Sequence, residues 1–114
     1  MKGVGLMLKK TIPFEVYAIE DNYSDKKEGI NLEELDNYII VGITKRFSTP
    51  GYDMEVENII KTEEGEFEIN LFIIPPKEGS ILLQVISYKT LAIKIDKSYL
   101  GKGPYKFKLA KIRN

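Results

Sequence analysis

Short runs of alternating apolar residues, each closed by a turn signal, constrain the fold of this chain more than any other feature. In FEINLFII, residues 67–74, every second residue is large and apolar, a period typical of a strand with one buried face. Pro75 and Pro76 follow directly and end the strand, since proline has no N–H to donate to a neighbouring strand. YIIVGI, residues 38–43, is apolar on both faces, which predicts a buried central strand.

Strand patterns of the same kind recur along the chain. They occupy residues 12–18, 53–60, 81–86, 91–95 and the tail that follows residue 104. The first is predicted to be half-buried and the second to bury one face. The residues expected to point inward in these two strands are Ile12, Phe14, Val16 and Ala18, then Met54, Val56 and Ile60.

The segments between these runs are polar or contain glycine. Residues 20–29 predict an exposed loop, residues 61–66 a hairpin turn with a glycine, and residues 87–90 a turn. Asn31, followed by two glutamates, predicts the cap of a helix of one or two turns. Residues 1–114 therefore predict a single all-β domain, a small antiparallel β-sandwich or barrel of about seven strands with one short helix.

The chain contains no cysteine and no histidine, which removes most catalytic and metal-binding chemistry. Disulfides, thiolate metal sites, Ser-His-Asp triads and histidine zinc sites are all excluded. The sequence therefore predicts no enzyme, no catalytic residue, no metal and no cofactor. Abundant Ile, Lys and Glu with no Trp resemble the composition of heat-adapted proteins.

The hydropathy pattern predicts a soluble domain. No apolar run approaches the roughly 20 residues that cross a bilayer, so no membrane span is expected. The N-terminus lacks the apolar stretch of a signal peptide. A cytoplasmic protein and an exported one whose signal has been removed both fit the sequence.

Three short motifs invite a catalytic or phosphate-binding interpretation, and each has a simpler explanation. The loop GKGP, residues 101–104, lacks the spacing and the Lys-Ser/Thr ending of a phosphate-binding loop. Ser87 and Lys89 would need a buried, neutral lysine to form a nucleophile and base. The acid pairs at residues 63–64 and at 66 and 68 lie in a predicted hairpin, which favours a solvated face over glycoside chemistry.

Opposite charges are concentrated in two segments although the formal net charge is zero. Residues 53–78 contain eight acidic residues against Lys61 and Lys77, and residues 89–113 contain eight basic residues against Asp96. The two segments either form neighbouring strands with complementary charges or present opposite faces to partners. The first interpretation is the simpler one.

The basic tail supports an alternative function, the binding of single-stranded nucleic acid on a small barrel. Aromatic residues and lysines are interleaved there. They are Tyr99, Tyr105 and Phe107, and Lys102, Lys106 and Lys108. Alternation, however, places rings and lysines on opposite faces of a strand, so a buried aromatic face with lysines in water is the commoner cause. Nucleic acid is therefore the second choice of partner.

The corner Thr49, Pro50, Gly51 and Tyr52 has the chemistry of a type II turn. Proline fixes φ at the second position, and glycine accepts a positive φ at the third. Phe47 and Tyr52 flank this turn. Pointing outward, their rings would form a rigid contact surface; pointing inward, they would close the end of the core, and the sequence favours the inward orientation.

Over residues 35–97 the chain resembles the PrcB C-terminal domain family, accessory subunits of bacterial protease complexes. The resemblance lies in the order of elements: an apolar strand ending in glycine, a Thr-Gly-Gly-Tyr turn, an acidic alternating strand, a hairpin, a strand ending near proline, and a final strand preceded by proline. Two residues depart from the family pattern: Pro50 stands where the family usually has the first glycine, and Lys89 stands where a proline would precede the last strand. The residues that match it are Gly42, Thr49, Gly51, Tyr52, Pro75, Pro76 and Gly79.

This resemblance implies a non-catalytic accessory module that binds and steadies a protein partner such as a protease. The expected contact surface combines two segments, the corner from Phe47 to Tyr52 and the loop from Pro75 to Gly79. Its expected partner-binding residues are Phe47, Thr49, Pro50, Gly51, Tyr52, Pro75 and Pro76.

Overall fold

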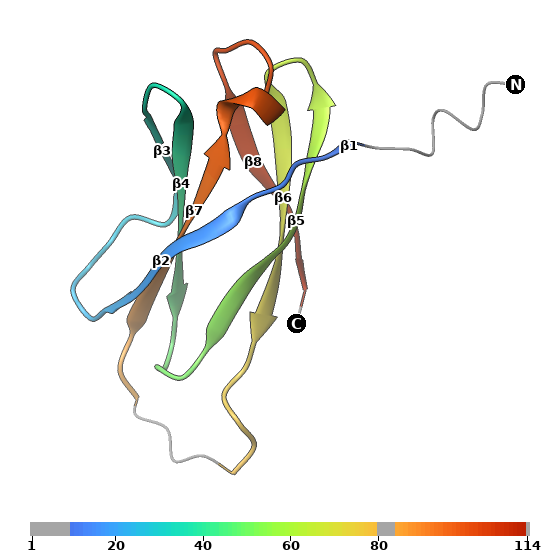
Figure 1. Ribbon diagram of the computed structural model, residues 1–114. Helices are drawn as coiled ribbons and strands as arrows, with labels where there is room; N and C mark the ends of the chain where they lie inside the picture. Colours follow the sequence, from blue (N-terminus) through green and yellow to red (C-terminus); the bar gives the residue numbers. More distant parts are fainter. Residues whose placement is uncertain (1–9, 80–83, 114) are drawn as a thin grey trace, which may run out of the picture.

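The computed structural model describes residues 10–79 and 84–113, which form two four-stranded sheets packed face to face (Figure 1). The strands are β1 (Lys10–Thr11), β2 (Glu15–Asn22), β3 (Gly29–Glu34), β4 (Tyr38–Phe47), β5 (Asp53–Glu63), β6 (Glu66–Ile74), β7 (Ser87–Asp96) and β8 (Lys106–Arg113). Sheet A has the order β1-β5-β6-β8, and sheet B has the order β2-β7-β4-β3. The predicted small β-sandwich is confirmed.

All strand pairs are antiparallel except β6 and β8, which run parallel. The chain leaves β7 in sheet B, passes through the short 3₁₀ helix η1 (Lys97–Tyr99) and enters sheet A on the far side of β6. A change of sheet allows a parallel neighbour, whereas a direct hairpin does not. No helix among the described residues is long and apolar enough to span a membrane.

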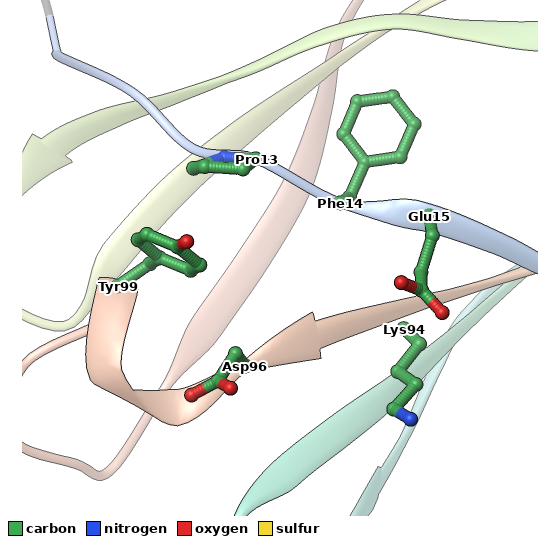
Figure 2. A pocket seen from close by; sticks show the side chains of 6 residues that line it. All are labelled: Pro13, Phe14, Glu15, Lys94, Asp96 and Tyr99. Carbon is green, nitrogen blue, oxygen red and sulfur yellow. The ribbon is translucent and has the colours of Figure 1, made fainter.

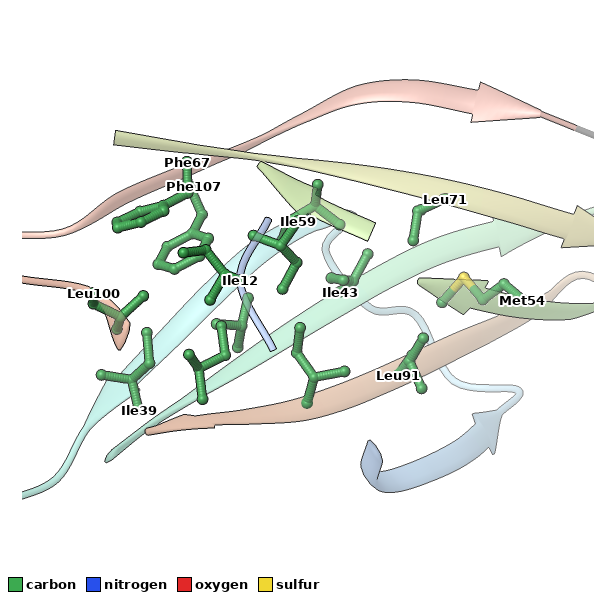
Figure 3. Close-up of a cluster of buried hydrophobic side chains, with 14 of the residues drawn as sticks. Ile12, Ile39, Ile43, Met54, Ile59, Phe67, Leu71, Leu91, Leu100 and Phe107 are labelled. Carbon is green, nitrogen blue, oxygen red and sulfur yellow. The ribbon is translucent and has the colours of Figure 1, made fainter. Parts of the chain in front are cut away.

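The core lies between the two sheets and is built mainly from alternate residues of β4, β6 and β7 (Figure 3). The four alternating residues of β6 are buried, as their period of two predicts. β4 lies between β7 and β3, so the expectation of a central strand at residues 38–43 is also confirmed. The buried residues contributed by these strands include Ile39, Val41, Ile43, Phe67, Ile69, Leu71, Ile73, Leu91, Ile93 and Ile95.

The helix predicted at Asn31 is wrong, because this residue lies in β3. Asn31 is opposite Gly42 in the antiparallel pair of β3 and β4. Ile30 packs against the core from this edge strand, so a long-range pairing overrides a local capping signal. The short helix lies instead at η1, where the Asp96 side chain accepts a hydrogen bond from the Ser98 backbone N–H at 2.9 Å.

The turn predicted at residues 87–90 is also wrong, because these residues begin β7. Thr90 pairs with Thr44 of β4, and their hydroxyl oxygens lie 2.8 Å apart. Of the strand predicted at residues 81–86, residues 81–83 lie outside the described residues, and residues 84–86 are not in a strand. Tyr88 and Thr90 both favour strands, so the predicted turn and the strand predicted at residues 91–95 form one long strand, β7.

A β-bulge in β5 corrects the predicted buried face of that strand. The pairing with β6 shifts between Val56 and Asn58, which changes the side of the sheet on which the later residues point. Ile59 is therefore fully buried, whereas the predicted Ile60 is only half-buried. Such a bulge leaves no clear mark in the alternation of residue types.

The half-buried strand predicted at residues 12–18 is instead divided between the two sheets. The Ile12 N–H donates to the Ile59 carbonyl at 2.9 Å, so the chain still runs along β5 at this point. Pro13 has no N–H to continue this ladder, and the chain crosses to join β7 as β2 (Figure 1). Ile12 is buried as predicted, but Val16 and Ala18 in β2 are exposed.

The acidic and basic segments of the sequence lie side by side, as one of the two interpretations predicts. Arg113 of β8 pairs with Glu57 of β5, and the Lys108 Nζ lies 3.8 Å from the Glu68 Oε2. These pairs cross sheet A on its solvent side. They are exposed enough for each to contribute only about 0–1 kcal/mol.

We expect Asp96→Asn to flatten the loss of stability in acid. The hydrogen bond from the Ser98 backbone lowers the pKa of Asp96, so folding favours the ionised carboxylate. This stabilisation is present above the unfolded pKa of about 3.9 and is lost as pH falls through the lower folded pKa. Asparagine keeps the capping oxygen but does not titrate.

The measurement is the midpoint of urea unfolding at pH 7 and at pH 3, with circular dichroism as the signal. The variant should be somewhat less stable than the wild type at pH 7, because it lacks the ionised carboxylate, and should lose less stability between pH 7 and pH 3. Glu64, whose pKa is lowered chiefly by a hydrogen bond from Lys61, serves as a second case through Glu64→Gln. Equal acid losses in wild type and Asp96→Asn would contradict the expected role of Asp96.

Candidate functional site

The corner between β4 and β5 forms the turn that the sequence predicts. Gly51 has a φ of 103°, which the side-chain-free residue adopts without steric cost. Phe47 and Tyr52 stack across the turn, with ring centroids 4.7 Å apart and an interplanar angle of 12°. Phe47 belongs to the buried core and Tyr52 packs against it, so the Phe47 ring points inward. Thr49 is buried, Pro50 is half-buried and Gly51 is exposed.

The two segments expected to form a contact surface meet at the same end of the sandwich. Asp53 lies opposite Ile74 in the β5–β6 pair, so Tyr52 and Pro75 leave this hairpin side by side. Pro75 is exposed and Pro76 is half-buried. In Figure 1 both the β4–β5 corner and the segment that follows β6 lie at the lower end of the molecule.

Two further apolar residues lie at this end and were not identified from the sequence. Phe47 is opposite Ser87 in the β4–β7 pair, which brings the preceding Val85 and Ile86 beside the corner. Their side chains are 41% and 42% exposed. The sequence predicts a strand at these positions, and their residue types alone do not mark them as exposed. We call the set of Phe47, Pro50, Tyr52, Pro75, Pro76, Val85 and Ile86 the apolar end.

A network of charged and polar groups fixes the strands beside the apolar end. The Lys89 Nζ lies 3.2 Å from the Asp21 Oδ1 and 3.6 Å from the Asp53 Oδ1, and its side chain is only 11% exposed. This lysine thus joins β2 and β7 to β5. The Tyr88 hydroxyl donates to the Asp25 Oδ1 at 2.7 Å, which raises the pKa of Tyr88 and holds the β2–β3 loop. The network stabilises the frame around the apolar end.

The motifs with a catalytic interpretation are used structurally. Lys89, the supposed base beside Ser87, lies between two carboxylates and forms ion pairs with Asp21 and Asp53. The Glu68 carboxylate pairs with Lys108, and Glu63 and Glu64 are exposed in the hairpin. Among the described residues, no three acidic side chains are arranged to hold a metal ion.

The basic tail has the orientation expected of a buried aromatic face. Phe107 is buried and stacks on Phe67 with centroids 4.8 Å apart, and Tyr105 packs against the core. Lys106 and Lys108 are exposed on the other face of β8. Along β8, rings and lysines therefore lie on opposite faces and do not form a common surface for stacking of bases and contact with phosphates.

A hollow of about 290 Å³ lies at the opposite end of sheet B from the apolar end (Figure 2). Glu15 and Lys94 are opposite each other on β2 and β7, and the Glu15 carboxylate points toward Lys94. The Lys94 Nζ also lies 4.4 Å above the Tyr38 ring. The residues lining the hollow are Pro13, Phe14, Glu15, Lys94, Asp96 and Tyr99. Its charged side chains are of both signs, with Glu15 and Asp96 against Lys94.

Comparison of the chain with protein-family models, with characterised proteins and with solved structures gave no match. The geometry of the apolar end and the residue patterns described above are therefore the basis for assigning a function.

Proposed function

We propose that this chain is a non-catalytic accessory module that binds a protein partner through its apolar end. The observation that carries the proposal is the meeting of two independently predicted segments, the β4–β5 corner and the Pro75–Pro76 segment, beside the exposed Val85 and Ile86. A protease is the expected kind of partner, because the resemblance to the PrcB C-terminal domain family implies one.

The composition of the apolar end suits protein binding. Prolines and a stacked ring pair are already held in one conformation, so little conformational entropy is lost when a partner binds. Exposed aliphatic side chains such as Ile86 supply the apolar contacts that form the centre of an interface. Loops at the end of a rigid sandwich commonly carry recognition, since the strands hold them in place.

The experiment is capture of partners from the lysate and the secreted fraction of the source cell, with the purified domain as bait. Val85→Ser/Ile86→Ser removes two exposed apolar side chains without opening the core. We expect the wild type to retain a protease or a subunit of a protease complex. The variant should bind the same partner with an affinity at least about tenfold lower.

Tyr99→Ser is the matched control, because Tyr99 is 45% exposed and lies beyond the opposite end of β7. It should capture the partner as the wild type does. Equal capture by the wild type and the Val85→Ser/Ile86→Ser variant would show that the apolar end is not the contact surface. Retention of nucleic acid instead of protein would support the alternative function of the basic tail.

A further inference from the structure

Sheet A is one strand short beside the first half of β5. β1 has only two residues and pairs with Lys61 and Ile60, at the far end of β5. After the bond from Ile12 to Ile59 the chain departs for sheet B at Pro13. Asp53 to Val56 therefore pair with β6 on one side, and on the other side no strand of the described chain pairs with them.

Opposite this gap, β2 of sheet B has an uncovered inner face. Val16 lies opposite Ile93 and Ile19 lies opposite Leu91, so these two residues share the core-facing side of sheet B. Ile93 and Leu91 are fully buried, yet Val16 and Ile19 are 58% and 48% exposed. The difference arises because β5 packs over β7, whereas no described strand of sheet A continues over β2.

The uncovered face and the open edge together form one apolar groove of about 290 Å³. Its floor consists of the buried side chains of Met54 and Leu91, and Val16 and Ile19 form one wall. The residues lining the groove are Phe14, Val16, Ile19, Asp53, Met54, Glu55, Val56 and Leu91. Such a shape fits the side chains on one face of an extended strand.

The backbone at the edge of the groove is available for pairing. The Met54 N–H donates to the Asp53 Oδ1 at 2.9 Å, so it points away from β6. Backbone groups of alternate residues point to the same side of a strand, so Val56 also presents its N–H and C=O to the groove. A carboxylate that caps an edge N–H weakens non-specific pairing but can be displaced by a true strand.

We propose that the protein partner binds by strand addition, with an extended segment of alternating apolar and basic residues pairing along Asp53 to Val56. Its apolar side chains would fill the groove. Its other side chains would lie beside the exposed Glu55 on the solvent face of sheet A, where a basic residue is favoured. This inference deepens the proposed function and rests on it for the protein nature of the partner.

The opposite edge of the same hairpin already uses this arrangement. β8 alternates basic and apolar residues and covers β6, where Lys106 lies opposite Glu66 and Lys108 lies opposite Glu68. Phe107 between them is buried. Two β5 edges from two copies of the chain would instead bring their acidic residues together, which favours a basic strand over a second copy.

The test measures binding of a fluorescent peptide, Lys-Val-Lys-Val-Lys-Val-Lys, to the full chain by fluorescence anisotropy. We expect saturable binding. Two altered peptides should each bind at least about tenfold more weakly: one with alternate backbone nitrogens methylated, and one with glutamate in place of lysine. Methylation removes the hydrogen bonds of an added strand but keeps its side chains and charge.

Val16→Thr/Ile19→Thr removes apolar surface from the groove without changing charge, and should also weaken binding about tenfold. Leu32→Thr is the matched control, because Leu32 is 39% exposed on the other edge strand of sheet B and should have no effect. Strand addition would be overturned if the peptide showed no saturable binding. It would also be overturned if the methylated peptide bound as tightly as the plain one, or if Val16→Thr/Ile19→Thr bound the peptide as tightly as the wild type. Sedimentation that shows a dimer lost in this variant would assign the groove to a second copy and also overturn it.

The two proposals can fail separately. If a protein partner is captured through Val85 and Ile86 but the peptide does not bind, the groove inference alone is wrong. If the peptide binds as expected but no protein partner is captured, the groove inference stands and the proposed role of the apolar end is wrong.

Discussion

Phe47→Ala is expected to lower the free energy of unfolding by about 3 kcal/mol, within the range for truncation of a buried phenylalanine. The ring is 9% exposed, belongs to the core cluster and stacks on Tyr52. Its removal opens a cavity at the end of the sandwich and also removes the stacking contact. Urea unfolding followed by circular dichroism measures the change.

Tyr52→Ala should cost less, about 1–2 kcal/mol, because the half-buried Tyr52 ring loses less contact than a buried side chain. Phe47→Leu keeps most of the buried volume and should cost less than about 1.5 kcal/mol. A loss below 1 kcal/mol for Phe47→Ala would contradict the packing of the ring. The expected loss also means that Phe47→Ala cannot report on binding alone, whereas the exposed Ile86 can.

The strands that could be predicted are those in which the pattern of apolar residues directly reflects which faces of the strand are buried. β6 alternates because one face is buried, and residues 38–43 of β4 are apolar on both faces because this strand lies inside sheet B. The predicted helix at Asn31 failed because capping is a local signal, whereas β3 exists through its pairing with β4. The turn predicted at residues 87–90 failed in the same way, since the pairing of β7 with β4 extends through residues that resemble a turn.

The candidate site was partly predictable for a related reason. Turn chemistry is local, so the corner with Pro50 and Gly51 and the end of β6 at Pro75 could be read from the sequence. Their meeting follows from the β5–β6 hairpin register. The approach of Ile86 depends on the register of β4 with β7, which pairs residues about 40 positions apart and has no local signal.

The groove beside β5 could not be predicted at all. It exists because Pro13 ends the pairing of the N-terminal strand with β5 and the chain then changes sheet. A continuous alternation from Ile12 to Ala18 hides this change, since both halves keep a period of two. The exposed Val16 therefore looks like a core residue in the sequence and becomes a surface residue only through the topology.

Gly65→Ala is expected to lower the free energy of unfolding by about 2–4 kcal/mol, through backbone strain and a steric clash together. Gly65 lies in the β5–β6 hairpin with a φ of 80°, which a residue with a Cβ adopts at a cost. An added Cβ would lie 2.7 Å from the Pro104 carbonyl oxygen, and this neighbour is backbone and cannot rotate away. The Lys106 N–H donates to the Gly65 carbonyl at 2.8 Å, so a shift at Gly65 would also disturb the start of β8.

Gly42→Ala is the matched control in urea unfolding, because Gly42 lies in a regular strand and an added Cβ would meet its nearest neighbour at 3.9 Å. It should leave stability unchanged or raise it by about 0.5–1 kcal/mol, as expected when alanine replaces glycine inside a strand. Equal losses in both variants would mean that the loss at Gly65 does not come from its conformation or from Pro104. A loss confined to Gly65→Ala would instead support the two causes given for it, the positive φ of Gly65 and its close approach to the Pro104 carbonyl.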